Sequence, residues 1–71
     1  MEIDSTVIKQ LINESVDNYL KGNLKLAEQK ALDVIKLYPQ SFHGNFLLGA
    51  ILHDQKRFNE AKTLTIKAIK L

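Results

Sequence analysis

The chain has 71 residues, no cysteine and 45% hydrophobic residues, which limits it to one small domain with a modest core. The missing cysteines exclude disulfides and thiolate metal sites, and the scattered lysines, at a formal net charge of +2, do not indicate nucleic-acid binding. No apolar run approaches the roughly 20 residues of a membrane span, and the acidic start at residues 1–4 is unlike a secretory signal. We therefore expect a soluble, cytoplasmic protein.

The first apolar series predicts an amphipathic helix from about Asp4 or Ser5 to Leu20. Its apolar residues lie three and four positions apart on one helical face: Ile8, Leu11, Ile12, Val16, Tyr19 and Leu20. Asp4, Ser5 and Thr6 can each accept a hydrogen bond from a free amide of the first turn. Gly22 can end the helix in a left-handed conformation.

Three more helices follow from the rest of the chain. A second apolar series runs from Leu24 to Leu37, and Pro39 stops it because proline lacks an amide hydrogen. Ser41 can cap a third helix, and a break near residues 54–57 separates this helix from a fourth that begins near Phe58. The sequence thus predicts an all-α fold of two antiparallel helix-turn-helix hairpins.

The two halves of the chain are similar at an offset of 34 residues. Ala27 then aligns with Ala61, Leu24 with Phe58, and residues 34–37 with residues 68–71. A helix-turn-helix period of this length resembles the tetratricopeptide repeat family. The resemblance implies two repeats in a single domain of residues 1–71, at about 8–41 and 42–71, stacked as a short α-solenoid.

Particular residues carry this resemblance. Those that resemble the family pattern are Leu48-Gly49, Leu52, Phe58, Ala61 and Ala68 in the second half, and Ser15, Gly22-Asn23, Ala27 and Pro39 in the first. Those that depart from it are Glu14, Asn18, Asn45 and Thr65. The departures in the first half suit a terminal repeat, which has no neighbour on one side. The small residues are expected to let neighbouring helices approach closely.

The resemblance also implies a site, because in this family the first helices of successive repeats line a groove that holds a partner. The predicted partner-binding groove consists of Ile12, Val16, Tyr19, Phe46, Leu47 and His53, with Phe46 as the preferred anchor. Ile12, Val16 and Leu47 occupy positions where a carboxylate-clamp subfamily needs polar residues. We therefore expect a protein or peptide partner, but not a carboxylate-clamp ligand.

No catalytic, metal or cofactor site is expected. The only two histidines, His43 and His53, are not three or four residues apart, so they do not stack as metal ligands on one helical face. The acidic residues are accounted for as helix-surface charges beside lysines, and no pair has evident general-acid and general-base roles. The chain is expected to be a binding module and not an enzyme.

The last predicted helix carries apolar residues that no later helix covers in this sequence: Leu64, Ile66, Ile69 and Leu71. Two interpretations compete, because the sequence is either an excerpt of a longer repeat array or a self-associating unit that buries this face in a homodimer. A further alternative is an accessory segment of a larger transferase or a small secretion-type chaperone. The leading hypothesis remains a peptide- or protein-binding scaffold.

Overall fold

The computed structural model describes residues 5–71 and shows no strand in that range. Its four helices are α1 (Ser5–Leu20), α2 (Leu24–Leu37), α3 (Phe42–Asp54) and α4 (Phe58–Lys70). The predicted all-α fold is therefore confirmed, with helix ends close to those expected from the capping residues, Gly22 and Pro39. Asp4, one of the expected caps of the first helix, lies outside the described residues.

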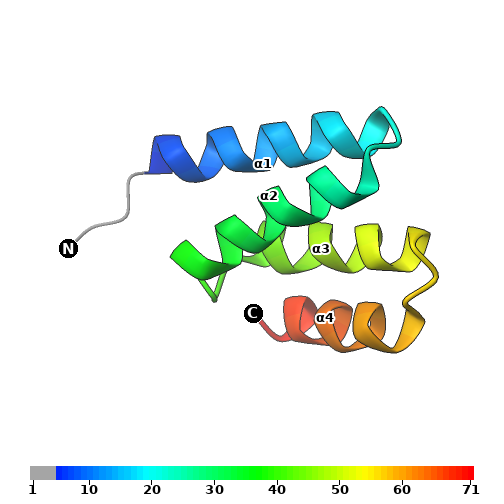
Figure 1. The fold of residues 1–71 in the computed structure, drawn as a ribbon. Helices are drawn as coiled ribbons and strands as arrows, with labels where there is room; N and C mark the ends of the chain where they lie inside the picture. The colour runs from blue at the N-terminus through cyan, green and yellow to red at the C-terminus, as the bar shows by residue number, and fades with distance from the viewer. Residues whose placement is uncertain (1–4) are drawn as a thin grey trace.

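The helices form two antiparallel hairpins, α1 with α2 and α3 with α4, that pack side by side (Figure 1). The hairpins meet mainly through α2 and α3, whereas α1 touches α3 more sparsely. The molecule is consequently a flat layer with extents of 36 × 28 × 14 Å. In such a layer α3 has a helix on either side, while α1 and α4 lie at the edges.

The two turns within the hairpins have the same geometry. Gly22 and Lys56, 34 residues apart, both adopt positive φ angles, of 82° and 64°. After each, an amide reaches back to the carbonyl five residues earlier, from Asn23 to Asn18 at 2.8 Å and from Arg57 to Leu52 at 2.9 Å. This hydrogen bond satisfies a carbonyl that the helix leaves free at its end.

The turn between the hairpins is held by two polar residues. Ser41 caps α3, because its hydroxyl accepts a hydrogen bond from the Gly44 amide at 2.9 Å. Asn45 is fully buried and its side-chain amide donates to the carbonyls of Pro39 and Ser41, at 3.1 and 2.8 Å. Asn45, which departs from the family pattern, therefore closes this turn instead of filling an apolar gap.

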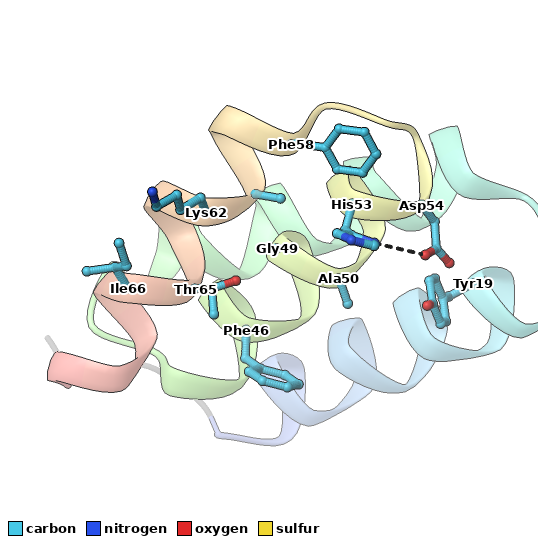
Figure 2. A pocket seen from close by; sticks show the side chains of 11 residues that line it. Tyr19, Phe46, Gly49, Ala50, His53, Asp54, Phe58, Lys62, Thr65 and Ile66 are labelled. Carbon is cyan, nitrogen blue, oxygen red and sulfur yellow. Dashed lines mark ion pairs between the residues drawn. The ribbon is translucent and has the colours of Figure 1, made fainter.

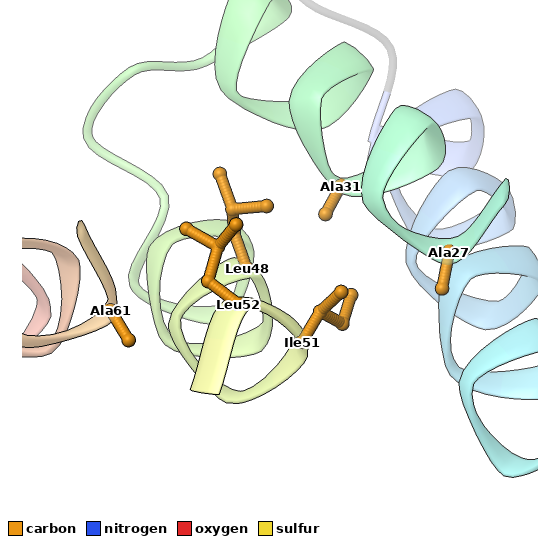
Figure 3. Packing of buried hydrophobic residues seen from close by; sticks show 6 residues of the cluster. All are labelled: Ala27, Ala31, Leu48, Ile51, Leu52 and Ala61. Atoms are coloured by element: carbon orange, nitrogen blue, oxygen red, sulfur yellow. The ribbon is translucent and has the colours of Figure 1, made fainter. Parts of the chain in front are cut away.

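The hydrophobic core is centred on α3 (Figure 3). Large side chains of α3 pack against small ones on both neighbours; the cluster consists of Ala27, Ala31, Leu48, Ile51, Leu52 and Ala61. Because alanine extends little from a helix, α2 and α4 can approach α3 closely. The first helix contributes less, and Ser15 is its only fully buried residue.

Helix contacts within each hairpin are close at equivalent positions. In the first hairpin the Ser15 hydroxyl donates to the Ala27 carbonyl at 2.8 Å. In the second, Gly49 lies so near α4 that an added Cβ atom would be 3.4 Å from the Ala61 carbonyl oxygen and 2.9 Å from Thr65 Oγ1. A small residue therefore lies at this position of each hairpin, where the neighbouring helix is in close contact.

Polar contacts also join the hairpins. The Glu28 carboxylate of α2 accepts a hydrogen bond from Gln55 Nε2 at 3.1 Å and forms an ion pair with Arg57 Nη1 at 3.0 Å. Arg57 also binds Glu60 through Nη2 at 2.7 Å, and this guanidinium lowers the pKa of the Glu60 carboxyl. One arginine thereby connects α2 to the first turn of α4.

Candidate functional site

The main candidate site is a groove between α3 and α4, called here the α3–α4 groove, with a volume of about 550 Å³ (Figure 2). Its lining residues are Tyr19, Phe46, Gly49, Ala50, His53, Asp54, Phe58, Ala61, Lys62, Thr65 and Ile66. Gly49 and Ala61 are buried, whereas the Phe46, Phe58 and Ile66 side chains remain 52%, 54% and 42% exposed. Small residues therefore line a hollow bordered by large apolar side chains.

One end of the groove is polar. The His53 ring lies 3.8 Å from an Asp54 carboxylate oxygen, measured from Nδ1, and packs edge-on against Phe58 with ring centroids 5.1 Å apart. Hydrogen bonding to Asp54 raises the pKa of the Tyr19 phenol, and burial and the negative charge of Asp54 raise it further. The single phenol proton is thus donated to Asp54, and Tyr19 and Asp54 together form the polar end of the groove.

Lys62 supplies the positive charge of the groove. It lies on α4, and its side chain extends in the same general direction as that of Ile66 (Figure 2). The ion pairs found within residues 5–71 do not include Lys62. Its ammonium group is therefore free to pair with a carboxylate of a bound molecule.

A second groove, the α1–α3 groove, lies where the first half of α1 faces the turn before α3, and its volume is about 1010 Å³. It is lined by Ser5, Ile8, Lys9, Ile12, Asn13, Tyr38, Gln40, Ser41, Phe42 and His43. Phe42 stacks on Phe46 with ring centroids 5.8 Å apart and planes inclined by 19°. This aromatic pair lies between the two grooves, since Phe46 lines one and Phe42 the other.

The structure places the six residues predicted to line a partner-binding groove in different surroundings. Tyr19, Phe46 and His53 line the α3–α4 groove, whereas Ile12 lines the α1–α3 groove. Val16 is 37% exposed on α1 and borders neither groove. Leu47 is half-buried and packs against the core cluster.

The apolar residues predicted for self-association also differ in their surroundings. Ile66, Ile69 and Leu71 are 42%, 76% and 46% exposed. Leu64, by contrast, is half-buried and packs against the core cluster. Three of these four side chains therefore remain available at the edge of the molecule.

Sequence reasoning missed the α4 side of the α3–α4 groove. Phe58, Lys62, Thr65 and Ile66 contribute to it, although the family resemblance directed attention to the first helix of each repeat. The signal that could have found them is the offset of 34 residues. Applied to Glu28 and Ala31, which lie on the surface of the first hairpin that meets α3, it leads to Lys62 and Thr65.

The described residues offer little for other kinds of site. Within residues 5–71, no group of three or more histidine, cysteine, aspartate or glutamate residues is arranged to hold a metal ion. The helices of that range are also too short or too polar to cross a lipid bilayer. No protein-family model matches the chain, and neither the curated proteins nor the solved structures contain a match to it.

Proposed function

We propose that the chain is a protein-interaction module of the tetratricopeptide repeat type that binds a protein or peptide partner through the α3–α4 groove. The observation that carries this proposal is the set of large, half-exposed apolar residues, Phe46, Phe58 and Ile66, around a hollow of small residues. Large side chains at the edge of an apolar hollow are typical of surfaces that bind protein segments. Membership of the repeat family is supported by the matching turns at Gly22 and Lys56.

The proposal is tested by selecting binding peptides from a displayed library against the folded chain. We expect the selected peptides to lose about tenfold or more in affinity for the Phe46→Ala variant, because truncating a central aromatic anchor typically costs more than 1 kcal/mol. Leu26→Ala is the matched control, since Leu26 is 43% exposed and borders neither groove. Circular dichroism would establish that both variants keep their helices.

The outcome against the proposal is equally clear. If selected peptides bind Phe46→Ala, Phe58→Ala and the parent chain with equal affinity, the α3–α4 groove is not the binding surface. A library that yields no binder at all would remove the support for a peptide-binding function.

A second candidate function is self-association through the end of α4. Its supporting observation is the exposure of Ile66, Ile69 and Leu71, three apolar residues of one edge. A homodimer through this edge requires the midpoint of thermal unfolding to rise with protein concentration, and Ile69→Glu to remove that dependence. A midpoint that is independent of concentration would rule this candidate out.

A further inference from the structure

The first hairpin already has a helix packed on it, and this contact shows which side chains such a surface accepts. Leu48, Ile51 and Leu52 of α3 pack in one cluster with Ala27 and Ala31 of α2 (Figure 3). Directly after the end of α3, the Gln55 side chain donates a hydrogen bond to the Glu28 carboxylate at 3.1 Å. The segment that contacts the first hairpin therefore carries three apolar residues on α3 and a polar residue at its C-cap.

The α3–α4 groove is the equivalent surface of the second hairpin. On the first hairpin the surface that meets α3 includes Tyr19, Ala27, Glu28 and Ala31. The residues 34 positions later are His53, Ala61, Lys62 and Thr65, and all four line the α3–α4 groove. Within residues 5–71 no third hairpin covers this surface, so it is free to receive a helix in the way that the first hairpin receives α3.

The two equivalent surfaces differ in charge at one decisive position. Glu28 is paired, because its carboxylate contacts both Gln55 and Arg57 and its side chain is only 18% exposed. The equivalent residue of the second hairpin is Lys62, which has the opposite charge and takes part in none of the ion pairs found within residues 5–71. A helix placed in the groove as α3 is placed on the first hairpin would bring its own counterpart of Gln55 to Lys62. A carboxylate is favoured there.

We propose that the α3–α4 groove binds an amphipathic helix of a partner protein, with apolar residues at positions i, i+3 and i+4 and an aspartate or glutamate at i+7. This inference rests on the proposed function and names the chemistry of the partner. A helix suits the groove because Ala61 projects little and allows a close backbone approach, as its equivalent Ala27 does for α3.

A second copy of the chain does not provide such a helix. In the whole sequence, only Leu47, Ala50, Ile51 and Asp54 fit the spacing of three apolar residues and an acidic one. Ile51 is completely buried in the core, so this face of α3 is not free to enter another molecule. The helix that fits the groove therefore does not come from a second copy of these 71 residues.

The inference is tested with two synthetic alanine-based helical peptides. Both carry leucine, isoleucine and leucine at the spacing of Leu48, Ile51 and Leu52, and they differ only at the position equivalent to Gln55, which is glutamate in one and lysine in the other. Fluorescence anisotropy of the labelled peptides gives their affinities for the folded chain at low salt. We expect the glutamate peptide to bind about fivefold more tightly than the lysine peptide.

Charge reversal in the protein locates the effect. In the Lys62→Glu variant the preference should invert, so that the lysine peptide binds more tightly. Lys67→Glu is the matched control, because Lys67 lies on the same helix, changes the net charge equally and does not line the groove. This control should retain the preference of the parent chain for glutamate, and Phe58→Ala should weaken the binding of both peptides.

Three results would overturn the inference, and they separate it from the function on which it rests. The role of Lys62 would be refuted if both peptides bound the parent chain equally. It would also be refuted if Lys62→Glu and Lys67→Glu changed the preference in the same way. Failure of both helical peptides, while library peptides still bind in a manner that depends on Phe46, would refute the helical partner but preserve the proposed function. If neither helical nor library peptides bind, both proposals fail.

Discussion

Lys56 occupies a backbone position for which glycine is better suited. Its φ of 64° lies in the left-handed region, and the equivalent residue of the first hairpin is Gly22, with a φ of 82°. A side chain in this region crowds the adjacent carbonyl, whereas glycine adopts it without that cost. The second hairpin therefore carries backbone strain that the first hairpin avoids.

Lys56→Gly should raise the free energy of unfolding by about 1 kcal/mol because it removes this strain. Part of that gain is offset, since glycine makes the unfolded chain more flexible. The measurement is urea denaturation followed by circular dichroism. Gly22→Ala is the reciprocal control: a Cβ atom at Gly22 would meet nothing within 4 Å, so any loss of stability there reports backbone strain alone. Destabilisation by Lys56→Gly would show that the left-handed turn is not strained.

Gly49 and Thr65 form a second test at single-residue resolution. Gly49→Ala would place a Cβ atom 2.9 Å from Thr65 Oγ1, so we expect a loss of about 1 kcal/mol even though alanine favours helix more than glycine does. In a Thr65→Ala background the clash is absent, and the same change should become stabilising by up to about 1 kcal/mol. Thermal or chemical denaturation of the parent chain, the two single variants and the double variant gives the interaction free energy between the two substitutions. Additive effects would contradict the proposed contact.

The raised pKa of Tyr19 gives a pH prediction. Since hydrogen bonding to Asp54 is its largest cause, Asp54→Asn should move the Tyr19 pKa back toward its ordinary value of about 10. Tyr19 becomes the only tyrosine in a Tyr38→Phe background, so absorbance of the tyrosinate follows it directly. The protonated Tyr19 phenol contributes to the free energy of unfolding through its hydrogen bond to Asp54. This contribution is fully present below about pH 10 and is lost as the pH rises through the folded-state pKa of Tyr19. An unchanged titration in Asp54→Asn would contradict this account.

At the scale of the helices, burial is concentrated in α3. This helix contains the buried residues Gly44, Asn45, Leu48, Gly49, Ile51 and Leu52, whereas α1, the longest helix, buries only Ser15. The difference follows from position, because α3 packs between α2 and α4 and α1 packs mainly on α2. Helix length therefore does not decide how much of a helix is buried in this protein.

Native-state hydrogen exchange should reflect that arrangement. We expect amides in the middle of α3 to exchange at rates close to those set by global unfolding, and amides in the first half of α1 to exchange fastest among the helical amides. Residue-resolved exchange by NMR measures both. Equal protection of α1 and α3 would mean that the molecule opens only as a whole and that the edge helix has no independent fraying.

The whole molecule depends on contacts between the two hairpins. The α2–α3 contact combines apolar packing at Ala27, Ala31 and Ile51 with the polar links from Glu28 to Gln55 and Arg57. Stacked repeats are stabilised by such nearest-neighbour interfaces. The α3–α4 groove is the surface on which the same kind of contact remains open, and this is why the proposed partner is a helix.

The sequence by itself determined the four helices and their ends. Apolar spacing of three and four residues defines each helix, Gly22 and Pro39 end the first two, and Ser41 begins the third. The turns at Gly22 and Lys56 also lie 34 residues apart, but their shared positive φ was found only in the structure. The helices and their ends depend on residues close together in the chain, so local physical chemistry is enough to predict them.

Only the tertiary structure decided which helical faces stay uncovered. Periodicity places Leu47 and Phe46 on the same helix, but the packing of α3 against its neighbours half-buries Leu47 and leaves Phe46 52% exposed. The presence of Lys62 at the α3–α4 groove likewise depends on how α4 packs against α3. A helical pattern specifies a face of the helix, whereas burial of that face depends on neighbours that are distant in the sequence.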